Sequence, residues 1–110
     1  MKILIVDDEL VVLHLISQTI KKAGYDVLTA TNENQAYGHI ASHGEDIKAL
    51  FIDLHIPGTN STQVLEHFSK MCPLSKVAVV TGYNNDEVDE NQIKVFQKPF
   101  KSGELVAWLQ

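Results

Sequence analysis

Short apolar runs recur along the chain at fairly even spacing. Each run is rich in aliphatic or aromatic residues and is bounded by polar residues, glycine or proline. Runs of this kind are typical of strands that are buried on both faces of a sheet. The pattern predicts strands over residues 3–6, 27–30, 49–52, 77–80 and 93–97.

Between these runs, apolar residues repeat at the spacing of a helix face. The spacing predicts helices over residues 9–23, 32–43, 60–71 and 102–109, and only a short, weak helix over 84–91. Gly24 is a typical stop for the first helix. Asn60, with Gln63 as its capping-box partner, is expected to start the third, and Ser102 to cap the last.

The alternation of strands and helices determines the fold class. Because each helix carries the chain back, successive strands start in the same direction and pair in parallel. Right-handed crossovers then give an α/β fold, a doubly wound parallel sheet with helices on both faces. In such sheets ligands bind outside the carboxyl ends of the strands, so the residues that end strands are the candidates for function.

Polar side chains end four of the five predicted strands. They are Asp7 and Asp8, Asp53, Thr81 and Lys98. Each alone has an ordinary structural interpretation, such as a helix cap, a turn or a solvated lysine. Together, however, three carboxylates at one edge repel one another unless cations lie among them. Lys98 and one divalent ion would balance their charge of −3, and carboxylate oxygens suit Mg²⁺.

Asp53 follows the third strand, which we expect at the centre of the sheet. A carboxylate can attack phosphorus while a metal ion and a lysine neutralise the charge on the transferring group. The charge pattern therefore predicts an aspartyl-phosphate site at Asp53.

Four motifs contain these residues in order: IVDDE at 5–9, FIDLHIPG at 51–58, VVTGY at 79–83 and KPF at 98–100. The ordered set resembles the two-component response regulator receiver domain over nearly the whole chain. The resemblance implies one domain over residues 1–110 with the flavodoxin-like strand order 2-1-3-4-5. It also implies a cis peptide bond before Pro99.

The resemblance implies a switch more than an enzyme. Asp53 would accept a phosphoryl group from a histidine kinase or phosphotransfer protein and lose it slowly to water. Thr81 would hydrogen-bond the phosphoryl group, Lys98 would pair with it, and His55 and Tyr83 would tune its lifetime. The implied Mg²⁺ ligands are Asp7, Asp8, Asp53 and the backbone carbonyl of His55. Phosphorylation would change the surface offered to a downstream protein or to an effector domain outside this sequence.

Three features depart from the family pattern. Ser61 stands where the family usually has glycine, and Val95 stands where it usually has an aromatic residue. The stretch between Thr81 and Lys98 is about one helical turn short. We therefore expect switching without an aromatic rotamer change, and a short, mobile fourth helix over 84–91.

Three rival functions fit the sequence less well. An aspartate-nucleophile phosphatase usually has a second acid two residues after the nucleophile and an inserted cap, but His55 stands there and the chain has no room for a cap. A flavin or dinucleotide binder needs a glycine-rich first loop, which is acidic here. A pseudo-receiver that only binds partners usually lacks an acid or the lysine, and both are present.

The composition limits which kinds of partner and which cellular compartment we expect. The net charge of −5 and the pI near 5.4 argue against direct nucleic-acid binding, which needs clustered Lys and Arg. A single cysteine, no leader pattern at Met1 and no membrane-length apolar run lead us to expect a cytoplasmic protein without a membrane anchor.

Overall fold

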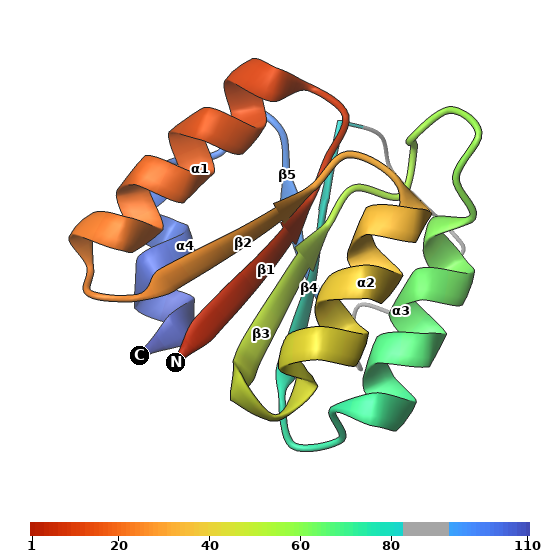
Figure 1. The fold of residues 1–110 in the computed structure, drawn as a ribbon. Coiled ribbons are helices and arrows are strands. Elements are labelled where there is room, and N and C mark those ends of the chain that lie inside the picture. The colour runs from red at the N-terminus through yellow and green to blue at the C-terminus, as the bar shows by residue number, and fades with distance from the viewer. Residues whose placement is uncertain (83–92) are drawn as a thin grey trace.

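The computed structural model describes residues 1–82 and 93–110, which contain one parallel sheet. Its strands are β1 (Lys2–Val6), β2 (Asp26–Ala30), β3 (Ile47–Ile52), β4 (Lys76–Thr81) and β5 (Lys94–Gln97). They pair in the order β2-β1-β3-β4-β5, which places β3 at the centre (Figure 1). The doubly wound sheet and its strand order are confirmed, and each strand begins and ends within two residues of its predicted bounds.

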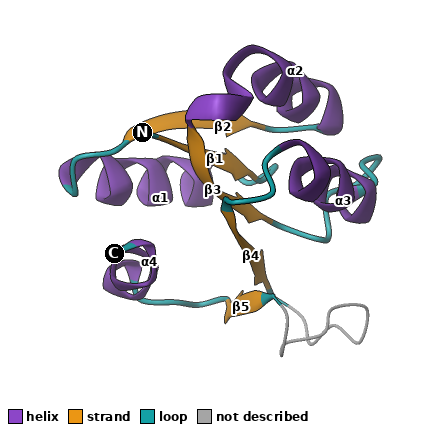
Figure 2. Cartoon of the chain, turned by 90° about the horizontal axis from the view of Figure 1, so that it is seen from below, coloured by secondary structure: helices purple, strands orange, loops and turns teal. Residues whose placement is uncertain are grey.

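Helices cover both faces of the sheet. In the described ranges they are α1 (Leu10–Lys22), α2 (Glu33–His43), α3 (Ser61–Met71) and α4 (Ser102–Leu109). Helices α1 and α4 lie on one face, and α2 and α3 on the other (Figure 2). The helix predicted over 84–91, with its expected shortness and mobility, lies outside the described residues. No helix in the described part of the chain is long and apolar enough to cross a membrane.

The ends of the helices follow the sequence signals in most places. Gly24 adopts a φ of 99° directly after α1, a conformation that glycine reaches without strain. Asn60 caps α3, since its side chain accepts a hydrogen bond from the Gln63 backbone N–H at 3.1 Å. The other half of the predicted capping box is wrong, because the Asn60 N–H donates to Oε2 of Glu33, at 3.4 Å, instead of to Gln63.

Two further helix features differ from prediction. The predicted N-cap position of α4 is wrong by one residue: Lys101 occupies it without a side-chain cap, and Ser102 is the first helical residue. A 3₁₀ helix, η1 (Gly44–Asp46), continues the chain after α2. Short extra turns of this kind are common at helix ends and have little sequence signature.

Two apolar clusters, one on each face of the sheet, make the core. Phe51 lies in the cluster under α1 and α4, and Phe68 in the cluster under α2 and α3; both are at most 1% exposed. Burial of one such side chain stabilises the fold by roughly 1.5–3 kcal/mol. The two clusters pack the sheet between two layers of helices. This packing holds the ends of the strands in place at the carboxyl edge of the sheet.

One buried hydroxyl group on the inner side of α1 lacks a hydrogen-bond partner among the described residues. Ser17, on α1, is 7% exposed, and its hydroxyl has no hydrogen-bond partner among the described residues. Ser17→Ala is expected to raise the free energy of unfolding by about 1 kcal/mol, because an unpaired buried hydroxyl is costly and Ala favours the helix. Urea unfolding measures the change, with the exposed Ser69→Ala on α3 as control for helix propensity. A Ser17→Ala variant no more stable than this control would contradict the expectation.

Candidate functional site

Lys98 joins the ends of distant strands at the carboxyl edge of the sheet. Its Nζ lies 3.0 Å from Oδ2 of Asp7, 3.0 Å from Oδ2 of Asp53 and 3.1 Å from Oε1 of Glu9. Asp7 follows β1, Asp53 follows the central β3, and Lys98 follows β5. The peptide bond between Lys98 and Pro99 is cis, as the resemblance implied.

The carboxylates themselves form a compact cluster. One oxygen from each of Asp7, Asp8, Glu9 and Asp53 lies within 4.8 Å of the others. Asp7 and Asp53 are buried, whereas Asp8 and Glu9 are exposed. Four acids and Lys98 give the site a formal charge of −3, rather than the −2 expected from three acids.

Glu9 is the member of the cluster that the sequence analysis missed. It follows the acidic pair directly, and its backbone N–H donates to Oδ1 of Asp7 at 2.9 Å. It is also the N-cap residue of α1, although its side chain makes no cap hydrogen bond. Its adjacency to the pair was the available signal, but only the folded chain brings its carboxylate to Lys98, 89 residues away.

Burial and charge shift two pKa values in the site. Burial raises the pKa of Asp7, an effect that hydrogen bonds from the Glu9 N–H and from Lys98 only partly offset. Burial favours loss of the proton from Lys98, but hydrogen bonds to Asp53, Asp7 and Glu9 outweigh it, and the pKa of Lys98 is raised. Lys98 is therefore held in its protonated form. Its single positive charge does not balance the four carboxylates around it.

Hydrogen bonds restrain Asp53 on every side. Its N–H donates to the Val6 carbonyl at 3.0 Å, continuing the pairing of β1 and β3. Its Oδ1 accepts from the His55 N–H at 2.8 Å, and its Oδ2 accepts from Lys98. Its carbonyl accepts from the Ser61 hydroxyl at 2.8 Å. The carboxylate is thus held in one orientation at the edge of the sheet.

The loop after Asp53 turns sharply towards α3. The Thr59 N–H donates to the Ile56 carbonyl at 3.1 Å, and Gly58 between them has a φ of 73°. This turn matches the Pro-Gly signal in the sequence. The turn leaves His55 exposed beside Asp53.

The remaining predicted site residues lie around this group. Thr81 is the last residue of β4, is 1% exposed, and accepts the Lys98 N–H at its carbonyl, at 2.7 Å. Tyr83, the second predicted flanking residue, lies outside the described residues. The structure therefore brings Asp7, Asp8, Asp53, Thr81 and Lys98 to one edge of the sheet.

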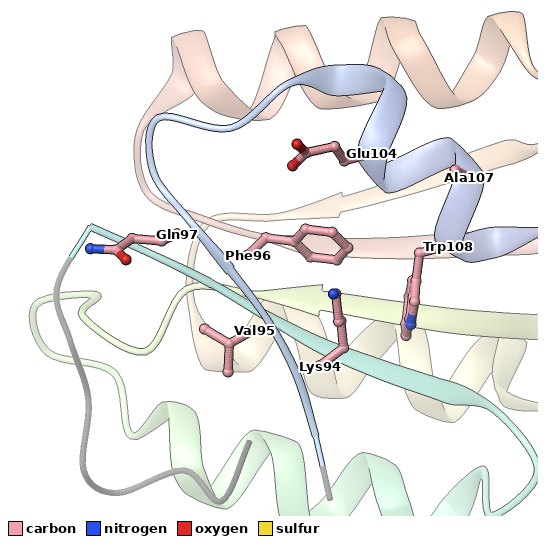
Figure 3. Close-up of a pocket in the computed structure, with 7 residues that line it drawn as sticks. All are labelled: Lys94, Val95, Phe96, Gln97, Glu104, Ala107 and Trp108. Atoms are coloured by element: carbon pink, nitrogen blue, oxygen red, sulfur yellow. The ribbon is translucent and has the colours of Figure 1, made fainter. Parts of the chain in front are cut away.

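Val95 and Phe96 face opposite sides of β5. Val95 packs against the cluster under α2 and α3, whereas Phe96 lies near Phe51 and Trp108 in the other cluster, with ring centroids 6.2 and 6.0 Å away. Residues of β5 and α4 line a cleft of about 550 Å³. Phe96 and Trp108 are among its lining residues (Figure 3). Val95, at the position where the resemblance led us to expect an aromatic residue, is thus small and partly buried. Switching without an aromatic rotamer change stays a prediction.

Known proteins match this chain along almost its whole length. It is 28% identical to sporulation initiation phosphotransferase F of Bacillus subtilis, over 94% of this chain and 86% of that protein. It is 30% identical to an NtrX-like response regulator of Rickettsia felis, over 98% of this chain but only 24% of that protein. The chain thus spans about a quarter of the length of its NtrX-like relatives.

A solved structure and a family model also match this chain along almost its whole length. A CheY-like response regulator receiver domain protein from Methanospirillum hungatei JF-1 superposes with a TM-score of 0.86 at 27% identity, over 98% of this chain and 89% of that one. The sequence model of the response regulator receiver domain matches residues 3–110. The chain belongs to the response regulator receiver domain family.

Proposed function

We propose that residues 1–110 form one receiver domain that accepts a phosphoryl group on Asp53 and acts as a signalling switch. The observation that supports this best is the contact of Lys98 with Oδ2 of Asp53, at 3.0 Å, inside a cluster of further carboxylates. The central strand presents Asp53 at the edge of the sheet, where ligands of doubly wound folds bind.

The chemistry needs a nucleophile and a source of positive charge. A carboxylate oxygen of Asp53 attacks phosphorus of a donor phosphohistidine, forming a P–O bond while the P–N bond breaks and the imidazole leaves. The Lys98 ammonium lies where it can neutralise charge on the phosphoryl oxygens. Thr81, at the end of the neighbouring β4, is proposed to donate a hydrogen bond to one of them.

The acidic cluster fits a hard divalent cation. Its ligand atoms are carboxylate oxygens within 4.8 Å of one another, a donor set that suits Mg²⁺ and not zinc. The residues proposed to hold the ion are Asp7, Asp8, Asp53 and the backbone carbonyl of His55. Bound Mg²⁺ would supply positive charge to the transferring group.

A protein donor and a protein target complete the proposal. The donor is proposed to be a histidine kinase or phosphotransfer protein. Leu10 and Val11 begin α1 directly after Glu9 and are 69% and 82% exposed, so apolar surface lies beside the acidic cluster. Phosphorylation is proposed to alter the surface that a downstream protein or an effector domain contacts.

The rival functions have less support. A phosphatase of the aspartate-nucleophile class would use a second acid where His55 stands, and the His55 side chain is exposed beside the site. A pseudo-receiver that never accepts phosphate would not need Lys98 on the Asp53 carboxylate. Slow hydrolysis of the aspartyl phosphate by water is the only turnover proposed for the domain.

Mass spectrometry of the intact protein tests the proposal. Incubation with acetyl phosphate and Mg²⁺ is expected to add one phosphoryl group to the wild type and none to Asp53→Asn, because the amide lacks the nucleophilic oxygen anion. Omission of Mg²⁺ should reduce the adduct strongly. The absence of an adduct in the wild type, or an unchanged adduct in Asp53→Asn, would overturn the proposal.

A further inference from the structure

A buried hydrogen bond closes the loop that carries Asp53. The Ser61 hydroxyl, in the first turn of α3, donates to the Asp53 backbone carbonyl at 2.8 Å. Ser61 is 3% exposed and Asp53 is 5% exposed, so water does not compete for either partner. A glycine or an alanine at this position would have no side chain that could make this bond.

The bond acts on the part of the loop that aims the carboxylate. The Asp53 carbonyl belongs to the peptide unit that joins Asp53 to Leu54, and the N–H of the following peptide unit, that of His55, donates to Oδ1 of Asp53 at 2.8 Å. By holding the Asp53 carbonyl, Ser61 therefore restrains the start of the turn that places the His55 N–H against Oδ1 of Asp53. Ser61 restrains one side of Asp53, and Lys98 restrains Oδ2 on the other.

We infer that Ser61 is a positioning residue for phosphoryl transfer, holding the Asp53 carboxylate in its attacking orientation through the backbone carbonyl. The inference rests on the proposed function and adds to it a residue that does not touch the reacting atoms. Small losses of alignment between nucleophile and phosphorus lower rates substantially. The effect should therefore fall on the transfer step and leave donor binding unchanged.

Three variants and one control test the inference. Ser61→Ala removes the hydroxyl, Ser61→Cys keeps most of the volume with a weak donor, and Ser61→Thr keeps a hydroxyl. Thr62→Ala removes the exposed hydroxyl of the next residue and is the matched control. Each protein is incubated with Mg²⁺ and a range of acetyl phosphate concentrations, and the maximal phosphorylation rate is separated from the half-saturating concentration.

The maximal rate is expected to fall about tenfold in Ser61→Ala and to fall in Ser61→Cys, with the half-saturating concentration nearly unchanged. Ser61→Thr and Thr62→Ala should stay near the wild type. The amide proton signal of His55 in an NMR spectrum should shift in Ser61→Ala, because its hydrogen bond to Asp53 loosens. This shift does not depend on phosphorylation.

The outcomes distinguish the inference from the proposed function. Equal maximal rates in the wild type, Ser61→Ala and Ser61→Cys would overturn the inference and leave the function standing. No phosphoryl uptake by the wild type would overturn both. If Ser61→Ala does not fold, a wild-type rate in Ser61→Cys would still overturn the inference.

Discussion

Lys98→Met is expected to lower the free energy of unfolding of the metal-free protein at pH 7 by about 3 kcal/mol. The variant keeps an apolar stem but leaves Asp7 and Asp53, whose side chains are 2% and 6% exposed, without their cation. Removing one partner from a buried ion pair is costly because the remaining charge stays buried and unpaired. Phosphoryl uptake should be lost as well, since no ammonium remains beside Asp53.

The destabilisation caused by Lys98→Met is also expected to depend on pH. Burial already raises the pKa of Asp7, and removal of Lys98 should raise it further above its value in the unfolded chain. A raised pKa in the folded state favours the protonated native form. The difference in stability between Lys98→Met and the wild type should therefore shrink as pH falls from 7 towards about 4.

Urea unfolding at several pH values measures this difference. Lys101→Met is the matched control, because it removes the same charge from an exposed lysine close by in the chain. Added Mg²⁺ should stabilise Lys98→Met, since a bound ion supplies the missing positive charge. A stability difference that is small, or that does not change with pH, would contradict the electrostatic account of the site.

Asp8→Asn is expected to lower Mg²⁺ affinity by about tenfold or more, and phosphoryl uptake with it. Asp8 is exposed within the acidic cluster, so the substitution removes a ligand charge and leaves the core intact. Thr81→Ala should leave Mg²⁺ affinity nearly unchanged while slowing phosphoryl uptake. The reason is that the Thr81 hydroxyl is proposed to contact the phosphoryl group and not the ion.

Titration calorimetry with Mg²⁺ separates these two roles. Asp26→Asn, at the start of β2, removes an exposed acid from the opposite edge of the sheet and controls for net charge. Metal-free Asp8→Asn should unfold no more easily than the wild type, because it relieves repulsion among the acids. Equal losses of Mg²⁺ affinity in Asp8→Asn and Thr81→Ala would show that the assigned roles are wrong.

The sequence predicts the strands because burial on both faces leaves a strong local signal, whereas their order was implied by the resemblance to the receiver family. A short apolar run such as 49–52 between polar neighbours favours a buried strand, and β3 (Ile47–Ile52) contains it. Polar residues that end such runs could then be assigned to one edge of the sheet without coordinates. This is why Asp53, Thr81 and Lys98 were found from their positions alone.

Contacts between side chains distant in sequence could not be predicted in this way. Glu9 has the local sequence of a helix N-terminus, and its approach to Lys98 depends on the docking of β5 beside β4. The Ser61 hydroxyl could be noted as a departure from the family, but its acceptor depends on the path of the loop. Likewise the Asn60 backbone N–H donates to Glu33 on α2, and not to the Gln63 side chain, because α2 and α3 pack side by side.

The three ion pairs of Lys98 can form only late in folding. They close sequence separations of 91, 89 and 45 residues, so none can form before the last strand has docked. A chain still emerging from the ribosome, or one whose C-terminal strand has locally detached, holds its acids without their ammonium. Such a chain is expected to be a poor phosphoryl acceptor. On the proposed function, phosphoryl uptake would therefore be confined to domains in which β5 has already docked beside β4.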